Sequence, residues 1–213
     1  MQQGRECITG LILAGGKGSR MNGQDKGLVP FDGRPLVEHV LERIRPQCAD
    51  LVLSVNRNEE VYSRYGYRLV VDEDKNFPGP LAGIAAALRV IDTEFMVVAP
   101  CDSPFLPMDY AQRLLEGLLR HPQAMVSAAR TQGHEQSVFM LIRRQALPAV
   151  QVALREGRLA VHRWLNETMH AVWVDFEDEH CFENLNRPQD LLNMKGLEGK
   201  NTNQMVDKTQ KGK

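Results

Sequence analysis

The feature that most constrains this fold is an unbroken apolar segment, residues 8–13, that runs directly into a long glycine-rich stretch ending at Gly27. So short an apolar run predicts a β-strand that is covered on both faces, as in a parallel sheet. The stretch behind it carries three cations, Lys17, Arg20 and Lys26. Glycines let backbone N–H groups approach an anion closely, and Lys or Arg neutralises its charge. The segment is therefore suited to bind a polyphosphate.

Two familiar phosphate-binding motifs do not fit this stretch. A P-loop requires a glycine, four residues and then Gly-Lys, but Gly18 and Gly23 are followed by Gln24. A dinucleotide fingerprint that begins at Gly16 meets Met21 where its last glycine belongs. The remaining alternative is a solvated surface loop. It is disfavoured because such length, basicity and glycine content rarely coincide directly behind a buried strand.

Along the rest of the chain, short apolar runs alternate with segments of helical periodicity, which is typical of β-α-β units. We expect a single three-layer α/β/α domain with a mostly parallel, Rossmann-like sheet over residues 8–194, an N-terminal extension over 1–7 and a disordered tail over 195–213. The expected strands are 8–13, 51–55, 69–71, 95–99, 125–129, 138–142 and 171–174, with 95–99 at the centre. The expected helices lie within 35–46, 81–91, 107–120, 146–155 and 160–166.

Composition and charge exclude several classes of protein. The chain is 43% hydrophobic and 25% charged, which is average for soluble globular proteins. Its formal net charge of -1 provides no global basic field for nucleic acid or anionic lipid. No signal peptide is evident, and no apolar segment approaches the roughly 20 residues of a membrane helix. We therefore expect a cytoplasmic protein without nucleic-acid or membrane partners, with four reduced cysteines, Cys7, Cys48, Cys101 and Cys181.

Polar residues that follow the expected strands are candidates for chemistry, because open α/β sheets bind ligands beyond the carboxyl ends of their strands. Asp102 follows the central strand, where a divalent cation bridging phosphates would sit; a helix-capping role is an equally good interpretation. Cys101 has no neighbouring His to activate it, so a small buried residue is favoured over a nucleophile. Asn56 and Arg57 follow another strand on the same edge, where a plain turn is the alternative.

Two further segments follow strands on this edge. Residues 72–74 form an acidic cluster, which is more often a solvated loop than a site. Residues 77–83 combine Pro and Gly into a rigid loop with exposed backbone groups at a helix start, which could recognise the edge of a base.

Three motifs occur in order along residues 8–192. They are Leu13-Ala14-Gly15-Gly16 with Arg20-Met21 and Asp25-Lys26, then Gly79-Pro80-Leu81-Ala82-Gly83, and then Pro100-Cys101-Asp102-Ser103-Pro104. Together they resemble the nucleotidyltransferase superfamily, and most of all the molybdenum cofactor guanylyltransferases. The resemblance implies transfer of GMP from GTP to the molybdopterin form of the cofactor, with Mg²⁺ and release of pyrophosphate. It also implies transient contact with other proteins of cofactor biosynthesis or with acceptor enzymes.

The resemblance assigns roles to individual residues. It places Lys26 on the phosphates and makes Asp102 the magnesium ligand, which favours that interpretation of the carboxylate over a helix cap. With Arg20 as a phosphate-neutralising cation, these residues form the expected catalytic group. The implied nucleotide contacts are Leu13, Ala14, Gly15, Lys26, Asn56, Asp72 and Asp102, with Asp74 as an alternative to Asp72 and an Asn184/Asn186 turn near the site.

Three alternatives remain open. A cytidylyltransferase for the same cofactor, or a transferase acting on a sugar phosphate, would keep the fold and change the substrates. A binding module that delivers or senses a nucleotide or pterin would bind tightly without releasing pyrophosphate. Competition between GTP, CTP and ATP, together with a pyrophosphate-release assay, separates these alternatives.

Overall fold

The computed structural model describes residues 4–15, 24–71 and 79–185. A seven-stranded sheet forms its centre, in the order β5-β4-β1-β6-β8-β7-β9. β6 is the fourth of the seven, which confirms the expected central strand. Strands β1, β4, β5 and β6 are parallel, β8 is antiparallel to both of its neighbours, and β9 is parallel to β7. The strands are β1 (Ile8–Leu13), β4 (Asp50–Ser54), β5 (Arg68–Val70), β6 (Phe95–Pro100), β7 (Val126–Thr131), β8 (His134–Arg143) and β9 (Val172–Phe176).

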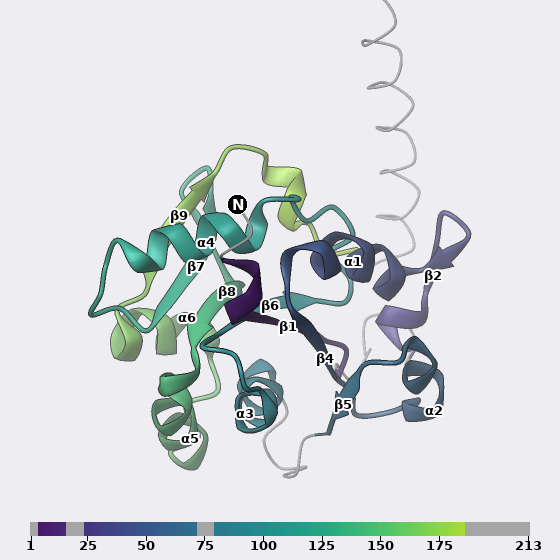
Figure 1. The fold of residues 1–213 in the computed structure, drawn as a ribbon, viewed down its shortest axis with the longest axis horizontal. Coiled ribbons are helices and arrows are strands. Elements are labelled where there is room, and N and C mark those ends of the chain that lie inside the picture. Colours follow the sequence, from purple (N-terminus) through teal and green to yellow (C-terminus); the bar gives the residue numbers. More distant parts are fainter. Residues whose placement is uncertain (1–3, 16–23, 72–78, 186–213) are drawn as a thin grey trace, which may run out of the picture.

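Helices cover both faces of this sheet, as Figure 1 shows. One face packs on α1 (Leu36–Ile44) and α4 (Tyr110–Leu119). The other packs on α3 (Pro80–Val90), α5 (Leu147–Arg155) and α6 (Val161–Trp164). β1 and β6 are buried along almost their whole length because both of their faces are covered. The three-layer α/β/α architecture is therefore confirmed.

The structure also contains elements that the sequence analysis did not predict. A two-stranded hairpin joins β2 (Pro30–Phe31) to β3 (Arg34–Pro35), and a short helix α2 spans Glu59–Tyr62. β8 begins at His134 rather than at residue 138 because a tight turn joins it directly to β7. The expected helix near 160–166 continues past α6 as a π-helical turn, Leu165–Met169. Short 3-10 helices lie at Arg5–Cys7, Lys26–Leu28, Arg45–Gln47, Ser63–Tyr65, Arg144–Ala146 and Glu179–Phe182.

The carboxyl ends of three neighbouring strands meet at one edge of the sheet. Leu13, the last residue of β1, lies opposite Ser54 of β4 and Pro100 of β6. Backbone pairing continues one residue further, because Ala14 N donates to Ser54 O at 2.8 Å and Cys101 N donates to Leu13 O at 3.1 Å. The segments that follow these strands therefore begin side by side.

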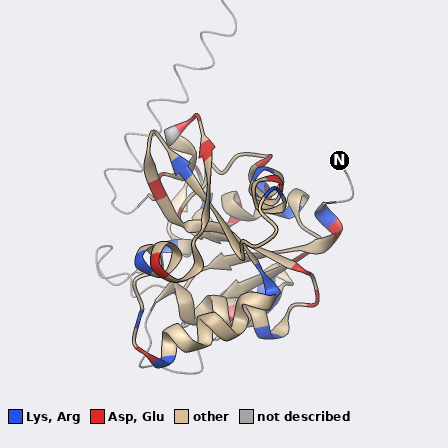
Figure 2. Ribbon diagram, turned by 90° about the vertical axis from the view of Figure 1, so that its left-hand side faces the viewer, with Lys and Arg blue, Asp and Glu red and all other residues tan. Residues whose placement is uncertain are grey.

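Figure 2 shows charged residues of both signs interspersed over the helices, the loops and parts of the strands. This distribution agrees with the near-zero net charge. Within residues 4–15, 24–71 and 79–185, no helix is both long enough and apolar enough to cross a membrane. The expected tail over 195–213 lies outside the described residues, and part of the expected N-terminal extension forms the 3-10 helix Arg5–Cys7.

Candidate functional site

Lys26 and Asp102 form an ion pair although 76 positions separate them in the sequence. Lys26 Nζ lies 3.2 Å from Asp102 Oδ2, and the side chains are 24% and 8% exposed. Asp102 follows β6, and the next helix, α4, begins only at Tyr110 with Asp109 at its N-cap. Asp102 therefore does not cap that helix. The carboxylate instead lies beside a cation at the edge of the sheet where the strands end.

The chain returns to Asp102 near the end of the described residues. Leu185 N donates to Asp102 O at 2.9 Å, and Ser103 Oγ donates to Asn184 Oδ1 at 2.5 Å. Leu185 is 1% exposed and belongs to a small apolar cluster with Val29, Phe31 and Leu36. Asn184 and Leu185 thus lie beside Ser103 and Asp102.

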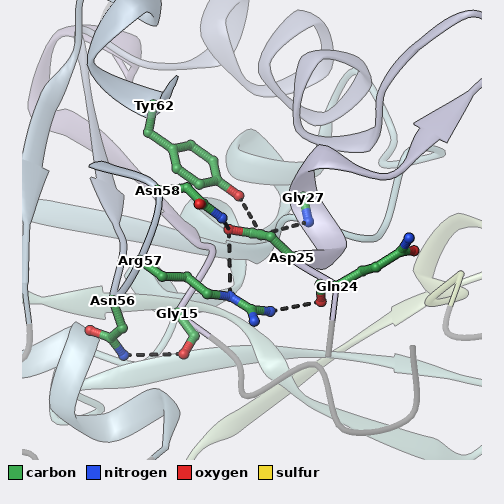
Figure 3. Close-up of polar contacts among 8 residues, drawn as sticks. All are labelled: Gly15, Gln24, Asp25, Gly27, Asn56, Arg57, Asn58 and Tyr62. Carbon is green, nitrogen blue, oxygen red and sulfur yellow. Dashed lines mark hydrogen bonds and ion pairs between the residues drawn. The ribbon is translucent and has the colours of Figure 1, made fainter. Parts of the chain in front are cut away.

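A buried carboxylate, Asp25, precedes Lys26 and forms the centre of a polar cluster (Figure 3). Its Oδ1 accepts hydrogen bonds from Tyr62 Oη at 2.8 Å and Gly27 N at 3.3 Å. Its Oδ2 accepts one from Asn58 Nδ2 at 2.9 Å and lies 3.7 Å from Arg57 Nε, an ion pair. Both oxygens of Asp25 are therefore surrounded by donors.

Asn56 and Arg57 connect the end of β4 to the two described ends of the glycine-rich stretch (Figure 3). Asn56 Nδ2 donates to Gly15 O at 3.1 Å, and Arg57 Nη2 donates to Gln24 O at 2.7 Å. Gly15 lies close under this amide, because an added Cβ would lie 2.7 Å from Asn56 Nδ2 and would require the Asn56 side chain to move. The two residues thus do more than form the plain turn that was the alternative interpretation.

Helix α3 packs closely against the same strand ends. A Cβ added at Gly83 would lie 2.5 Å from Ser54 Oγ and 3.0 Å from Leu13 Cδ2. Pro80 stands at the first position of this helix, where its missing N–H costs no hydrogen bond. The N-terminal part of α3 is therefore held against the ends of β1 and β4.

Burial suppresses the acidity of two groups in this region. Burial, reinforced by the neighbouring Asp102 carboxylate, raises the pKa of the Cys101 thiol well above its ordinary value. Burial likewise raises the pKa of Tyr62, and its hydrogen bond to Asp25 acts in the same direction. Cys101 is thus a neutral buried thiol rather than an activated nucleophile. The Tyr62 hydroxyl stays protonated and donates its hydrogen bond to Asp25.

Some expected site residues cannot be placed. Arg20, Asp72, Asp74 and Asn186 lie outside the described residues. Among the residues that the structure does describe, no three His, Cys, Asp or Glu side chains cluster as metal ligands.

Asp25, Asn58 and Tyr62 belong to this cluster but were not predicted as site residues from the sequence. Asp25 was noted only as part of a motif, and Tyr62 lies on α2, a helix of four residues that left no periodic pattern. For Asn58 and Tyr62 the available signal was their position behind β4, on the edge that already carried Asn56.

The chain is similar to known proteins over most of its length. Residues 10–172 match the family model described as the MobA-like NTP transferase domain. The chain is 40% identical over 189 residues to a molybdenum cofactor guanylyltransferase of Polynucleobacter asymbioticus, covering 87% of this chain and 94% of that protein. It is also 40% identical to one of Cupriavidus metallidurans, covering 88% and 94%.

Solved structures are similar as well. The crystal structure of molybdopterin-guanine dinucleotide biosynthesis protein A from Archaeoglobus fulgidus superimposes with a TM-score of 0.74 at 26% identity, covering 90% of this chain and 99% of the other. A CMP:2-keto-3-deoxy-manno-octonic acid synthetase in complex with CTP reaches a TM-score of 0.69 at 13% identity, which indicates a common fold only.

Proposed function

The chain belongs to the family of MobA-like NTP transferases, and on this premise we propose that it is a molybdenum cofactor guanylyltransferase. It transfers GMP from GTP to the molybdopterin form of the cofactor and releases pyrophosphate. The single observation that carries the site assignment is the approach of Lys26 Nζ to Asp102 Oδ2 at 3.2 Å, since it joins a cation and a carboxylate from two distant motifs at one edge of the sheet.

Lys26 and Asp102 have complementary roles in this proposal. The Lys26 ammonium contacts the triphosphate and stabilises the charge that develops on the departing pyrophosphate. The Asp102 carboxylate lies at the same edge and fits a magnesium ligand, because protein Mg²⁺ sites commonly use one or two carboxylates and take their other ligands from substrate phosphates and water. When bound, Mg²⁺ supplies positive charge to the phosphate oxygens.

The nucleotide is bound along the ends of β1 and β4. Leu13, Ala14 and Gly15 line the end of β1, and Asn56 lies beside them through its hydrogen bond to Gly15. Asp72 belongs to the same proposed pocket. Arg20 is the second cation of the glycine-rich stretch that we assign to the phosphates.

The acceptor reacts in a single displacement. The terminal phosphate of molybdopterin attacks the α-phosphorus of GTP in line with the departing pyrophosphate, and no covalent enzyme intermediate is required. GTP and molybdopterin are thus the small-molecule partners. We further propose a cytoplasmic enzyme that makes transient contact with other proteins of cofactor biosynthesis or with the enzymes that accept the finished cofactor.

The test is pyrophosphate release with GTP, CTP or ATP and a molybdopterin acceptor. We expect GTP to be the preferred donor, and we expect Lys26→Ala and Asp102→Ala each to lower kcat by about 100-fold or more, since removing one preorganised charge contact typically costs about 3 kcal/mol. Glu94→Ala is the matched control, because it breaks an ion pair with Arg143 at the amino end of β6, opposite the end that Asp102 follows.

The outcomes separate the alternatives. Turnover like that of the wild type in either variant would refute the role of that residue. A preference for CTP would favour the cytidylyltransferase. Tight GTP binding without pyrophosphate release from the wild-type protein would favour the non-catalytic binding module.

A further inference from the structure

The Asp25 carboxylate is buried immediately next to the proposed phosphate-binding lysine. Its side chain is 5% exposed, whereas that of Lys26 is 24% exposed. A buried carboxylate is costly unless charges and hydrogen-bond donors surround it. Every contact of Asp25 described above is with a donor, so the structure meets this condition.

Asp25 also determines where the backbone of Lys26 lies. It is the N-cap of the 3-10 helix Lys26–Leu28, and its carboxylate accepts the N–H of Gly27. An N-cap oxygen fixes the first turn of a helix. This helix packs so closely on Tyr62 that a Cβ added at Gly27 would collide with the Tyr62 hydroxyl. The segment that carries Lys26 therefore has little freedom to move while Asp25 keeps its partners.

The side-chain donors to Asp25 come from the segment that follows β4. The consecutive residues Asn56, Arg57 and Asn58 hydrogen-bond in turn to Gly15 O, to Gln24 O and to the Asp25 carboxylate (Figure 3). One short segment thus holds both described ends of the glycine-rich stretch. The position of Lys26 relative to the end of β1 is set through β4, which lies next to β1 in the sheet.

We propose that Asp25 is a positioning residue, which acts through Lys26 by holding its ammonium opposite Asp102. Tyr62 and Asn58 act one step further away, by holding the Asp25 carboxylate. The raised pKa of Tyr62 supports this arrangement, since its hydroxyl remains a donor over the pH range of an enzyme assay. The inference rests on the proposed function, in which Lys26 contacts the phosphates.

The decisive experiment is a double-mutant cycle on pyrophosphate release from GTP and molybdopterin. Asp25→Asn keeps the size of the side chain, but it removes the charge and turns an NH₂ group toward existing donors. We expect it to lower kcat about 10- to 100-fold when Lys26 is present, because small displacements of a catalytic group cost that much. In the Lys26→Ala background the same change should lower kcat less than about twofold, since the group that it positions is gone.

A more conservative variant tests the proposal with less risk of unfolding the protein. Tyr62→Phe removes only the hydroxyl that donates to Asp25, and we expect kcat to fall about 3- to 10-fold, again only when Lys26 is present. Tyr65→Phe is the matched control. It removes the hydroxyl of the neighbouring tyrosine, which donates to Glu38 at 3.1 Å and not to Asp25, and it should leave kcat unchanged.

Each outcome bears on one claim. Equal losses from Asp25→Asn and Tyr62→Phe in both backgrounds would overturn the positioning role, because general damage is additive with loss of Lys26. Unchanged kcat in both variants would overturn it as well. If Lys26→Ala itself leaves kcat unchanged, the proposed function of Lys26 fails instead, which is a distinct result.

Discussion

Burial decides the chemistry of single residues in this protein. Cys101 lies directly before Asp102, and the sequence alone could not exclude a nucleophile at that position. In the structure it is 6% exposed among apolar residues, and burial raises the pKa of its thiol well above the ordinary value. A neutral thiol is a poor nucleophile. The interpretation of Cys101 as a small packing residue is therefore supported.

Cys48 allows a test of the same principle away from the site. Burial raises the pKa of its thiol from 9.0 to about 12. Below pH 9 the thiol is protonated in both states, and above pH 9 only the unfolded state loses the proton, so stability falls as pH rises. Relative to Cys48→Ala, the wild-type free energy of unfolding should fall by about 1.4 kcal/mol between pH 8 and pH 10.

Urea unfolding of both proteins at these two pH values measures this difference. Cys7→Ala is the control, because the Cys7 thiol is less buried and the pH-dependent difference should be smaller. A difference between wild type and Cys48→Ala that does not change with pH would show that the Cys48 thiol titrates alike in the folded and unfolded states.

At the scale of elements, short turns explain where the sequence predictions fell short. Both unpredicted hairpin connections are two-residue turns, Asp32-Gly33 and Gln132-Gly133, in which every residue has a positive φ. Such pairs favour the turns that join adjacent antiparallel strands. The turn at 132–133 explains why β8 reverses direction within an otherwise mostly parallel sheet. The signal was present in the sequence, but the flanking strands lacked a clear alternating pattern.

Helix α3 depends on a glycine where it meets the sheet. A methyl group at Gly83 would press on Ser54 Oγ at 2.5 Å and on Leu13 Cδ2 at 3.0 Å. We expect Gly83→Ala to lower the free energy of unfolding by about 1–3 kcal/mol through overpacking. In a Ser54→Ala background the closest of these contacts is absent, so the cost should be smaller.

Chemical denaturation of the two single variants and the double variant measures this coupling. Strict additivity would contradict the packing argument. Because α3 contacts the ends of β1 and β4, we also expect Gly83→Ala to raise the KM for GTP.

At the scale of the whole molecule, the end of the described chain packs against the segment that carries Asp102. The Leu185 N–H donates a hydrogen bond to the Asp102 carbonyl oxygen. The Leu185 side chain packs in the apolar cluster with Val29, Phe31 and Leu36. Deleting residues 184–213 should therefore lower Tm by at least about 4 °C, the effect expected from removing one buried leucine. Pyrophosphate release should fall as well, because Asp102 loses its backbone partner.

Deleting only residues 195–213 is the control. The composition of this segment predicts a disordered tail, so Tm and turnover should be unchanged. Leu185→Ala in the full chain separates the loss of the side chain from the loss of the terminus. Equal Tm values for both deletions would contradict a structural role for residues 184 and 185.

Sequence by itself determined the layers, the central strand and the chemical character of the loops behind β1 and β6. It could do so because burial on both faces, helical periodicity and glycine content are local properties of a chain. Only the tertiary structure decided that Lys26 meets Asp102, and that Asn58 and Tyr62 hold Asp25. These contacts join residues 33 to 76 positions apart. They exist because parallel strand register brings the ends of separate segments to one edge, and no local pattern records which side chains meet there.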